Sequence, residues 1–241
     1  DGKSTNKADA SKTADLIRGK EGTEVKLTVL RDTKTHDYTI TRAKVTDSSV
    51  ASEVRGGVGI LKIRRFDTDT GMLARQAAEQ LKDQGVKGII LDLRDNSGGY
   101  LDQSQQVAGL WLNHQLVVTE RKKGIQTDAL DSVGLPVLKD IKTVVLVNGS
   151  SASASEIVAG ALKDHKVATL IGETTYGKGT VQQVLNLSEG AQLKVTVAHW
   201  YTPGGVNIAE KGIAPDVRVE LTLEDLNAGR DPQLDAAMKQ L

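Results

Sequence analysis

Apolar and polar positions form a helical pattern and then two alternating patterns near the start of the chain. Apolar or small residues recur at helical spacing over residues 8–17. Segments 24–30 and 36–41 alternate with a period of two, which predicts two strands joined by a polar turn. One helix and one hairpin make a marginal core by themselves. We therefore expect a small first domain, residues 1–45, and a larger second domain, residues 46–241.

Beyond a polar linker at 46–52, short apolar runs alternate with helical patterns. The apolar runs predict strands at 58–63, 88–93, 143–147, 167–171 and 193–200. Helical spacing predicts helices at 69–84, 101–112, 153–163 and 232–241. In the helix 69–84, the side chains expected to face the core are Met72, Ala77, Ala78 and Leu81. This alternation predicts the α/β class, with a mostly parallel sheet covered on both faces.

Composition excludes several classes of function. The 241 residues hold 31 Lys+Arg and 31 Asp+Glu, so the net charge of zero argues against a nucleic-acid groove or a basic membrane surface. Cysteine is absent and the four His are scattered, so no metal-ligand spacing and no thiol nucleophile are found. We expect no metal, no cofactor, no nucleic-acid partner and no membrane contact within this chain. It lacks a signal-peptide pattern, so we expect targeting information to lie outside it.

Two loops that follow predicted strands are unusual. Residues 94–99 end in Gly98-Gly99, either a turn that needs positive φ or a pair of bare backbone N–H groups able to face an oxyanion. Residues 148–156 contain four serines at a predicted helix start. Ser153 with Glu156 fits a capping arrangement, but a cap explains only one serine. A run of small residues at a helix N-terminus would admit a substrate backbone beside a nucleophilic hydroxyl.

A serine nucleophile requires a base. His165 lies at the far end of the helix that Ser153 opens, about 18 Å away at 1.5 Å per residue. Lys178 is the remaining candidate, although a lysine between two glycines is usually a solvated one. An ordinary lysine, with a pKa of about 10.4, must be desolvated to act as a neutral base at pH 7. If a strand begins near Lys178, then Thr180 and Gln182 share its face, and Gln182 would hold the amine in place.

These motifs together resemble a known family, the carboxy-terminal processing peptidases or tail-specific proteases. The resemblance covers nearly the whole chain and is carried by segments 92–99, 151–157, 172–182, 201–205, 211–216 and 231–234. It implies a crotonase-like core and a Ser-Lys dyad that cleaves protein substrates near their C-termini. Ser153 would be the nucleophile, Lys178 the base and Gln182 its positioning residue. The oxyanion donors would be the amide of Ala154 and one from Gly98 or Gly99, with Gly99 preferred.

The resemblance also bears on the first domain and on the partners. Family members carry a PDZ domain before the core, and residues 8–17 and 24–41 resemble its groove helix and last two strands. The front half of a PDZ domain, with its carboxylate-binding loop, has no counterpart here. The partners implied are proteins or peptides with unstructured C-termini, and a homo-oligomer is compatible with the family. The implied location is the cell envelope, on its periplasmic or extracellular side.

Two other functions stay open from the sequence. A crotonase-like enzyme acting on a thioester would use paired backbone amides to stabilise an enolate, and coenzyme A binding would reveal it. The other alternative is a protein without catalytic activity that only binds peptide tails. Labelling of Ser153 by a serine-directed probe would distinguish it from a peptidase.

Overall fold

The computed structural model describes residues 1–5, 9–31, 33–43, 48–186, 191–209 and 211–241. These residues form two compact units, Asp1–Asp47 and Ser48–Leu241.

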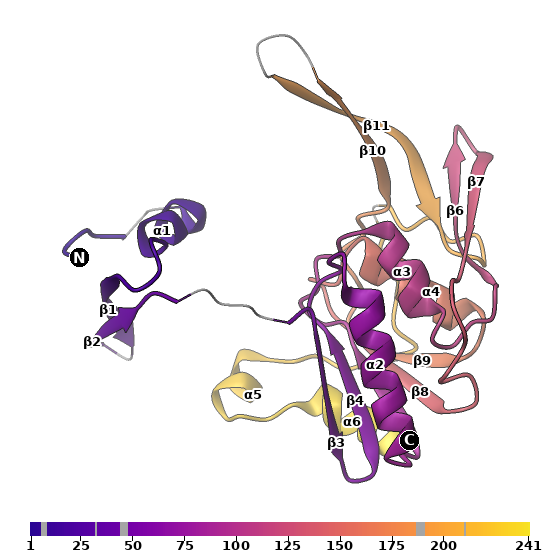
Figure 1. Ribbon diagram of the computed structural model, residues 1–241, viewed down its shortest axis with the longest axis horizontal. Helices are drawn as coiled ribbons and strands as arrows, with labels where there is room; N and C mark the ends of the chain where they lie inside the picture. Colours follow the sequence, from indigo (N-terminus) through magenta and orange to yellow (C-terminus); the bar gives the residue numbers. More distant parts are fainter. Residues whose placement is uncertain (6–8, 32, 44–47, 187–190, 210) are drawn as a thin grey trace. The chain divides into compact units, whose positions relative to one another are not determined.

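The first unit contains helix α1 (Ala10–Ile17) and a hairpin of strands β1 (Glu24–Arg31) and β2 (Lys34–Thr41) (Figure 1). The strands pair antiparallel, as their alternating sequences predict. Arg42 joins the helix to the hairpin, because its guanidinium donates to the carbonyl of Ile17 at 2.8 Å and to that of Glu24 at 2.9 Å. The helix and hairpin predicted from the sequence are confirmed.

The second unit is built on a six-stranded sheet in the order β12-β9-β8-β5-β4-β3. Its strands are β3 (Val50–Arg55), β4 (Val58–Ile63), β5 (Gly88–Asp92), β8 (Lys142–Val147), β9 (Ala168–Gly172) and β12 (Val217–Arg218). All neighbours pair parallel except β3 and β4, which form an antiparallel hairpin. The mostly parallel α/β sheet predicted from the sequence is confirmed.

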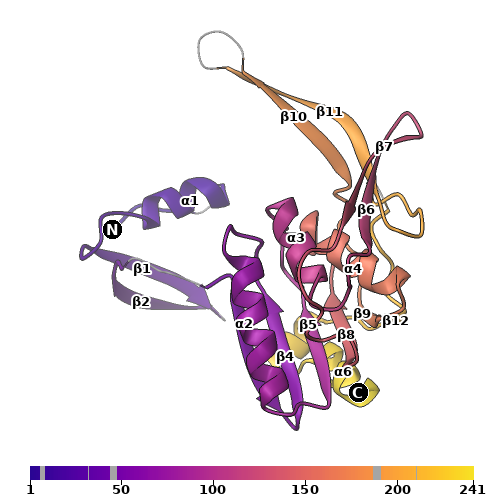
Figure 2. The same ribbon diagram turned by 45° about the vertical axis from the view of Figure 1, so that its right-hand side comes forward.

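Helices cover both faces of this sheet (Figures 1 and 2). Helices α2 (Thr70–Asp83), α3 (Leu101–Ala108) and α4 (Ala154–Asp164) pack on one face; α6 (Pro232–Gln240), which follows the short α5 (Leu223–Asn227), packs on the other. Strand β5 shows why both faces need cover. Ile89 and Leu91 enter the core under α2 to α4, whereas Ile90 enters the core under α6.

A second, antiparallel sheet has the strand order β10-β11-β6-β7. Its members are β6 (Leu116–Lys122), β7 (Ile125–Asp131), β10 (Thr180–Asn186) and β11 (Gln192–Tyr201). Strands β10 and β11 extend together away from the six-stranded sheet (Figures 1 and 2). Of these, β11 was predicted from the sequence, and β10 was considered only as a possible strand beginning near Lys178. The strand β7 is solvated along nearly its whole length, so it lacks the apolar alternation that would reveal a strand.

The structure also corrects three smaller predictions. Met72 is 55% exposed, because the buried face of α2 carries Ala74, Ala77, Ala78 and Leu81. Residues 50–52 belong to β3 rather than to a linker, and residues 44–47 lie outside the described part. Helix α3 ends at Ala108, four residues earlier than predicted. Within the described ranges, no helix has the length and apolar character needed to cross a membrane.

Candidate active site

Two loops meet at the carboxyl ends of the neighbouring parallel strands β5 and β8, where α/β sheets place their sites. The buried Asn96 links them. Its Nδ2 donates to the carbonyl of Ile63 at 2.8 Å, and its Oδ1 accepts the N–H of Gly98 at 2.9 Å. Its own carbonyl accepts the N–H of Ala152 and the hydroxyl of Ser155, each at 2.9 Å. One asparagine therefore fixes the glycine loop against the serine loop.

Ser153 occupies the N-cap position of α4 in an unusual backbone conformation. Its φ is 56° and its ψ is −117°, in a region that residues other than glycine rarely adopt. The side chain is half-buried at the point where the chain turns from β8 into α4. A serine on a strained strand-to-helix turn is the arrangement that presents a nucleophile in α/β hydrolases. The positive end of the helix dipole also lies at this position.

The carboxylate of Glu156 connects the serine loop to the lysine segment. The side chain is fully buried. Its Oε2 accepts the backbone N–H of Ser153 at 2.8 Å and that of Lys178 at 2.9 Å. Its Oε1 accepts the hydroxyl of Thr175 and the N–H of Gly177, both at 2.6 Å. Four donors therefore converge on one carboxylate, which brings the two predicted dyad residues together through their backbones.

The side chain of Lys178 is exposed, whereas a lysine that acts as a neutral base must be desolvated. Within the described part of the chain, its amino group makes no hydrogen bond. The reason is local: the backbone of Lys178 is held by Glu156, and the neighbouring Gly179 is the residue that packs inward, against Ile208 and Ala209. Gln182 is also exposed, on β10.

The glycine pair packs closely beside the serine loop. Gly98 has a φ of 99°, and a Cβ there would lie 2.7 Å from the Cβ of Ser153 and 3.0 Å from the amide nitrogen of Ala154. The N–H of Gly98 is already donated to Asn96. Gly99 has a φ of 146°. Among the described residues, the amides of Gly99 and Ala154 have no acceptor, so these two N–H groups are the ones available to an oxyanion.

Arg94, at the start of the loop that contains the glycine pair, binds residues at the start of α6. Its guanidinium donates to both carboxylate oxygens of Asp92 at 3.0 Å, to Asp231 at 2.9 Å and to Gln233 at 3.2 Å. Burial works against the charge, but the hydrogen bonds and charges of Asp92 and Asp231 outweigh it and raise the pKa of Arg94 above its ordinary value. The end of β5 is thereby tied to the start of α6.

Sequence reasoning missed part of this arrangement. Glu156 was expected only as a capping partner of Ser153, and neither Asn96 nor Thr175 was singled out. The signal for Glu156 is a carboxylate one helical turn after a loop serine, but the spacing does not reveal its bonds to residues 175–178. Within the described residues, no three His, Cys, Asp or Glu side chains are arranged to hold a metal ion.

Residues 57–219 match peptidase family S41, and the chain belongs to this family. A protein of Staphylococcus haemolyticus (strain JCSC1435) named as a CtpA-like serine protease is 38% identical over 221 residues, covering 91% of this chain and 45% of that protein. A protein of the same name from Staphylococcus aureus (strain COL) is 40% identical over 206 residues, covering 85% of this chain and 42% of the relative. The chain thus spans less than half the length of these curated relatives.

Two solved structures are also similar to this chain. The photosystem II D1 C-terminal processing protease matches with a TM-score of 0.70 and 32% identity, over 91% of this chain and 61% of that one. Mature CPAF complexed with lactacystin matches with a TM-score of 0.59 over 92% of this chain and 67% of that one. At 13% identity, CPAF supports the fold alone. The family resemblance inferred from the sequence motifs is confirmed.

Proposed function

We propose that this chain carries the catalytic site of a serine endopeptidase that cleaves protein substrates near their C-terminal tails. Ser153 is the nucleophile, Lys178 the base and Gln182 the residue that positions the amine. The observation that carries the proposal is the buried Glu156, whose Oε2 accepts the amides of both Ser153 and Lys178. The names of the staphylococcal relatives and of the D1 processing protease support the same reaction class.

The reaction proceeds in two stages. Neutral Lys178 removes the proton of Ser153 as the hydroxyl attacks the scissile carbonyl. The tetrahedral oxyanion lies between the amides of Ala154 and Gly99, each worth about 3 kcal/mol in comparable sites. Gly98 completes this turn, but its own N–H is committed to Asn96. Protonated Lys178 then gives its proton to the leaving amine, and water hydrolyses the acyl-enzyme.

The exposed amino group of Lys178 must be shielded from water before it can act as a base. An extended substrate tail that enters as an added strand would exclude water from the amine and favour its neutral form. The strand β10, which begins two residues after Lys178, forms one edge of the four-stranded sheet. A tail paired with this edge would bring its peptide bonds past the site, so substrate binding and activation of the base are one event.

The remaining assignments follow the family resemblance. Residues 1–45 are the C-terminal half of a PDZ domain, and residues 46–241 are a protease core with a crotonase-like fold. The substrates are proteins or peptides with unstructured C-termini. The site of action is the cell envelope, on its periplasmic or extracellular side.

A catalytically silent peptide-binding chain is the second candidate, and the exposure of Lys178 favours it. A fluorophosphonate probe with mass-spectrometric mapping distinguishes the two. A peptidase should label at Ser153, and Ser153→Ala should abolish the label. The neighbouring Ser150→Ala should keep it. Absence of label in the presence of a tailed peptide would contradict the peptidase and favour the silent alternative. Coenzyme A binding in the same protein would instead favour a thioester enzyme.

A further inference from the structure

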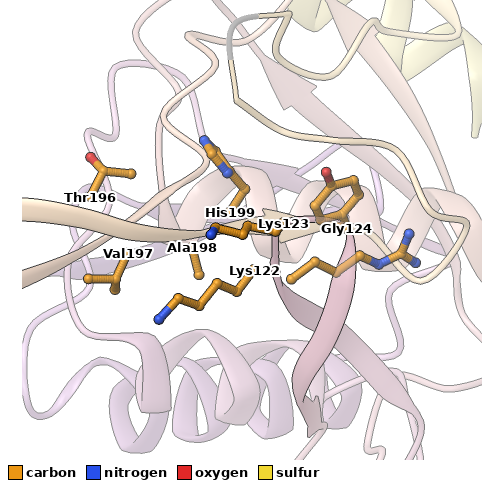
Figure 3. A pocket seen from close by; sticks show the side chains of 9 residues that line it. Lys122, Lys123, Gly124, Thr196, Val197, Ala198 and His199 are labelled. Carbon is orange, nitrogen blue, oxygen red and sulfur yellow. The ribbon is translucent and has the colours of Figure 1, made fainter.

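A groove of about 540 Å³ opens between the β6–β7 turn and the strand β11. Its lining comes from the segments 121–124 and 196–199, with Tyr201. Figure 3 shows that Lys122 and Lys123 extend their side chains in the same direction, with His199 near them. The groove therefore combines two basic side chains with the backbone of a strand.

The charged side chains that line the groove are all positive. Arg121, Lys122 and Lys123 are basic, and none of the lining residues is acidic. Lys122 and Lys123 are exposed, and neither forms an ion pair with a residue that the structure describes. The guanidinium of Arg121 lies 4.5 Å from the ring centroid of Tyr201, which orients it by a cation–π contact. In a chain of zero net charge, this concentration would attract a carboxylate-bearing ligand.

The floor of the groove has a strand edge that can accept another strand. β11 pairs with β6 only over the three positions His199 to Tyr201, although β11 itself begins at Gln192. Thr196 and Ala198 therefore pair with β10 on one edge, with Val197 at a register shift between them, and within the described ranges residues 196–198 pair with no strand on the other edge. An extended peptide can add to such an edge through its backbone.

The groove also lies close to the proposed catalytic site. His199 is the cross-strand partner of Thr180, and the N–H of Trp200 donates to the carbonyl of Gly179 at 2.7 Å. These contacts place the groove next to the segment that carries Lys178. A peptide lying in the groove would therefore be held beside the point of cleavage.

We propose that this groove is a specificity subsite that binds an extended substrate segment rich in Asp or Glu, an inference that rests on the proposed peptidase function. Lys122 and Lys123 contact the acidic side chains, and the free edge of β11 pairs with the backbone of this segment, which is separate from the tail that pairs with the edge of β10. Arg121, held over Tyr201, defines one wall. The subsite selects substrates by the charge of a segment next to the cleaved bond.

Matched peptides test this subsite. Two C-terminally amidated fluorogenic peptides differ only in carrying three Glu or three Gln beside the cleaved bond, so a terminal carboxylate plays no part. We expect kcat/KM to favour the Glu peptide by about three- to tenfold at low salt, as partly exposed ion pairs allow, with a smaller ratio at high salt. The preference should vanish in Lys122→Gln/Lys123→Gln. It should persist in Lys82→Gln/Lys87→Gln, because these exposed lysines lie near the end of α2 and just before β5 and do not line the groove.

Direct binding separates this inference from the peptidase proposal. Fluorescence anisotropy measures the affinity of both peptides for Ser153→Ala, with and without the two groove substitutions. If wild type cleaves neither peptide but Ser153→Ala binds the Glu peptide more tightly through Lys122 and Lys123, the subsite stands and the peptidase proposal fails. If cleavage requires Ser153 but the Glu/Gln ratio is equal in all variants, the subsite is overturned and the peptidase proposal stands.

Discussion

The carboxylate of Glu156 accepts the backbone N–H of Lys178 at 2.9 Å, from within a fully buried position. The same oxygen accepts the N–H of Ser153 at 2.8 Å. The first turn of α4 and the segment that follows β9 are therefore fixed to each other by one side chain. The separation between the backbones of Ser153 and Lys178 depends on this carboxylate.

Glu156→Gln tests that dependence. The amide replaces one acceptor oxygen with a donor, which must then face N–H groups that also donate. We expect the free energy of unfolding to fall by about 1–3 kcal/mol and activity to be largely lost. Urea unfolding and peptide turnover measure the two effects. The exposed Glu79→Gln in α2 is the control and should change neither. A stable, fully active Glu156→Gln would contradict the positioning role.

Removal of either dyad side chain should abolish turnover without unfolding the protein. Ser153→Ala and Lys178→Ala should each lower kcat by about 10³-fold or more. The nucleophile and its base act as a unit, so removing either one should remove most of the activity. Lys178 is exposed, so its removal should leave the melting temperature nearly unchanged. Lys139→Ala, another exposed lysine, is the control. Turnover by Lys178→Ala at the wild-type rate would remove lysine from the mechanism.

The backbone of Ser153 stores strain that glycine should release. At a φ of 56° and a ψ of −117°, an alanine keeps the steric conflict of the Cβ, whereas a glycine does not. Ser153→Gly should therefore be more stable than Ser153→Ala by about 1 kcal/mol, with both variants inactive. Thermal unfolding of the pair measures this difference. Equal stability would indicate that the turn relaxes when the hydroxyl is removed.

Gly98→Ala should disturb the site through a direct clash. The added Cβ would meet the carbonyl oxygen of Ala152 and the Cβ of Ser153, both at 2.7 Å. Gly85 also has a positive φ, 68°, but a Cβ there meets nothing within 4 Å, so Gly85→Ala controls for backbone strain alone. We expect both variants to lose stability and only Gly98→Ala to lose most of its kcat. Equal activities would show that the glycine loop does not bear on the serine.

The ion pair of Asp231 with Arg94 should make the free energy of unfolding depend on pH. Burial alone would raise the pKa of Asp231, but hydrogen bonds from Arg94 and from the amide of Leu234 outweigh it and set the pKa below its ordinary value. Such a group stabilises the fold above its unfolded pKa of about 3.9, and this stabilisation is lost as the pH falls through the folded value.

Asp231→Asn keeps an N-cap residue for α6 but removes the charge. The free energy of unfolding of the wild type should exceed that of the variant by about 1–2 kcal/mol at neutral pH, and this difference should shrink as the pH falls below the unfolded pKa of about 3.9. Urea unfolding at the two pH values measures it. The exposed Asp235→Asn on the same helix should show no such pH dependence. A difference that is constant with pH would assign the effect to helix capping rather than to the ion pair.

The sequence reveals features that depend on neighbours along the chain, and it fails where distant segments meet. The buried run Ile89–Leu91 and the serine loop before α4 are visible as patterns. The roles of Glu156 and Asn96 are not, because their partners come from segments far apart in sequence. The exposure of Lys178 is hidden for the same reason, since it depends on Gly179 packing against Ile208 and Ala209.

The tie between Arg94 and the start of α6 also has a consequence for biosynthesis. Residues 231 and 233 supply two of the acceptors of Arg94, and they emerge from the ribosome long after the loop they support. A nascent chain can form its early strands, but Arg94 lacks these two acceptors until residue 233 has left the ribosome. The glycine loop would thus reach its final rigidity only after nearly all of the second unit has been made.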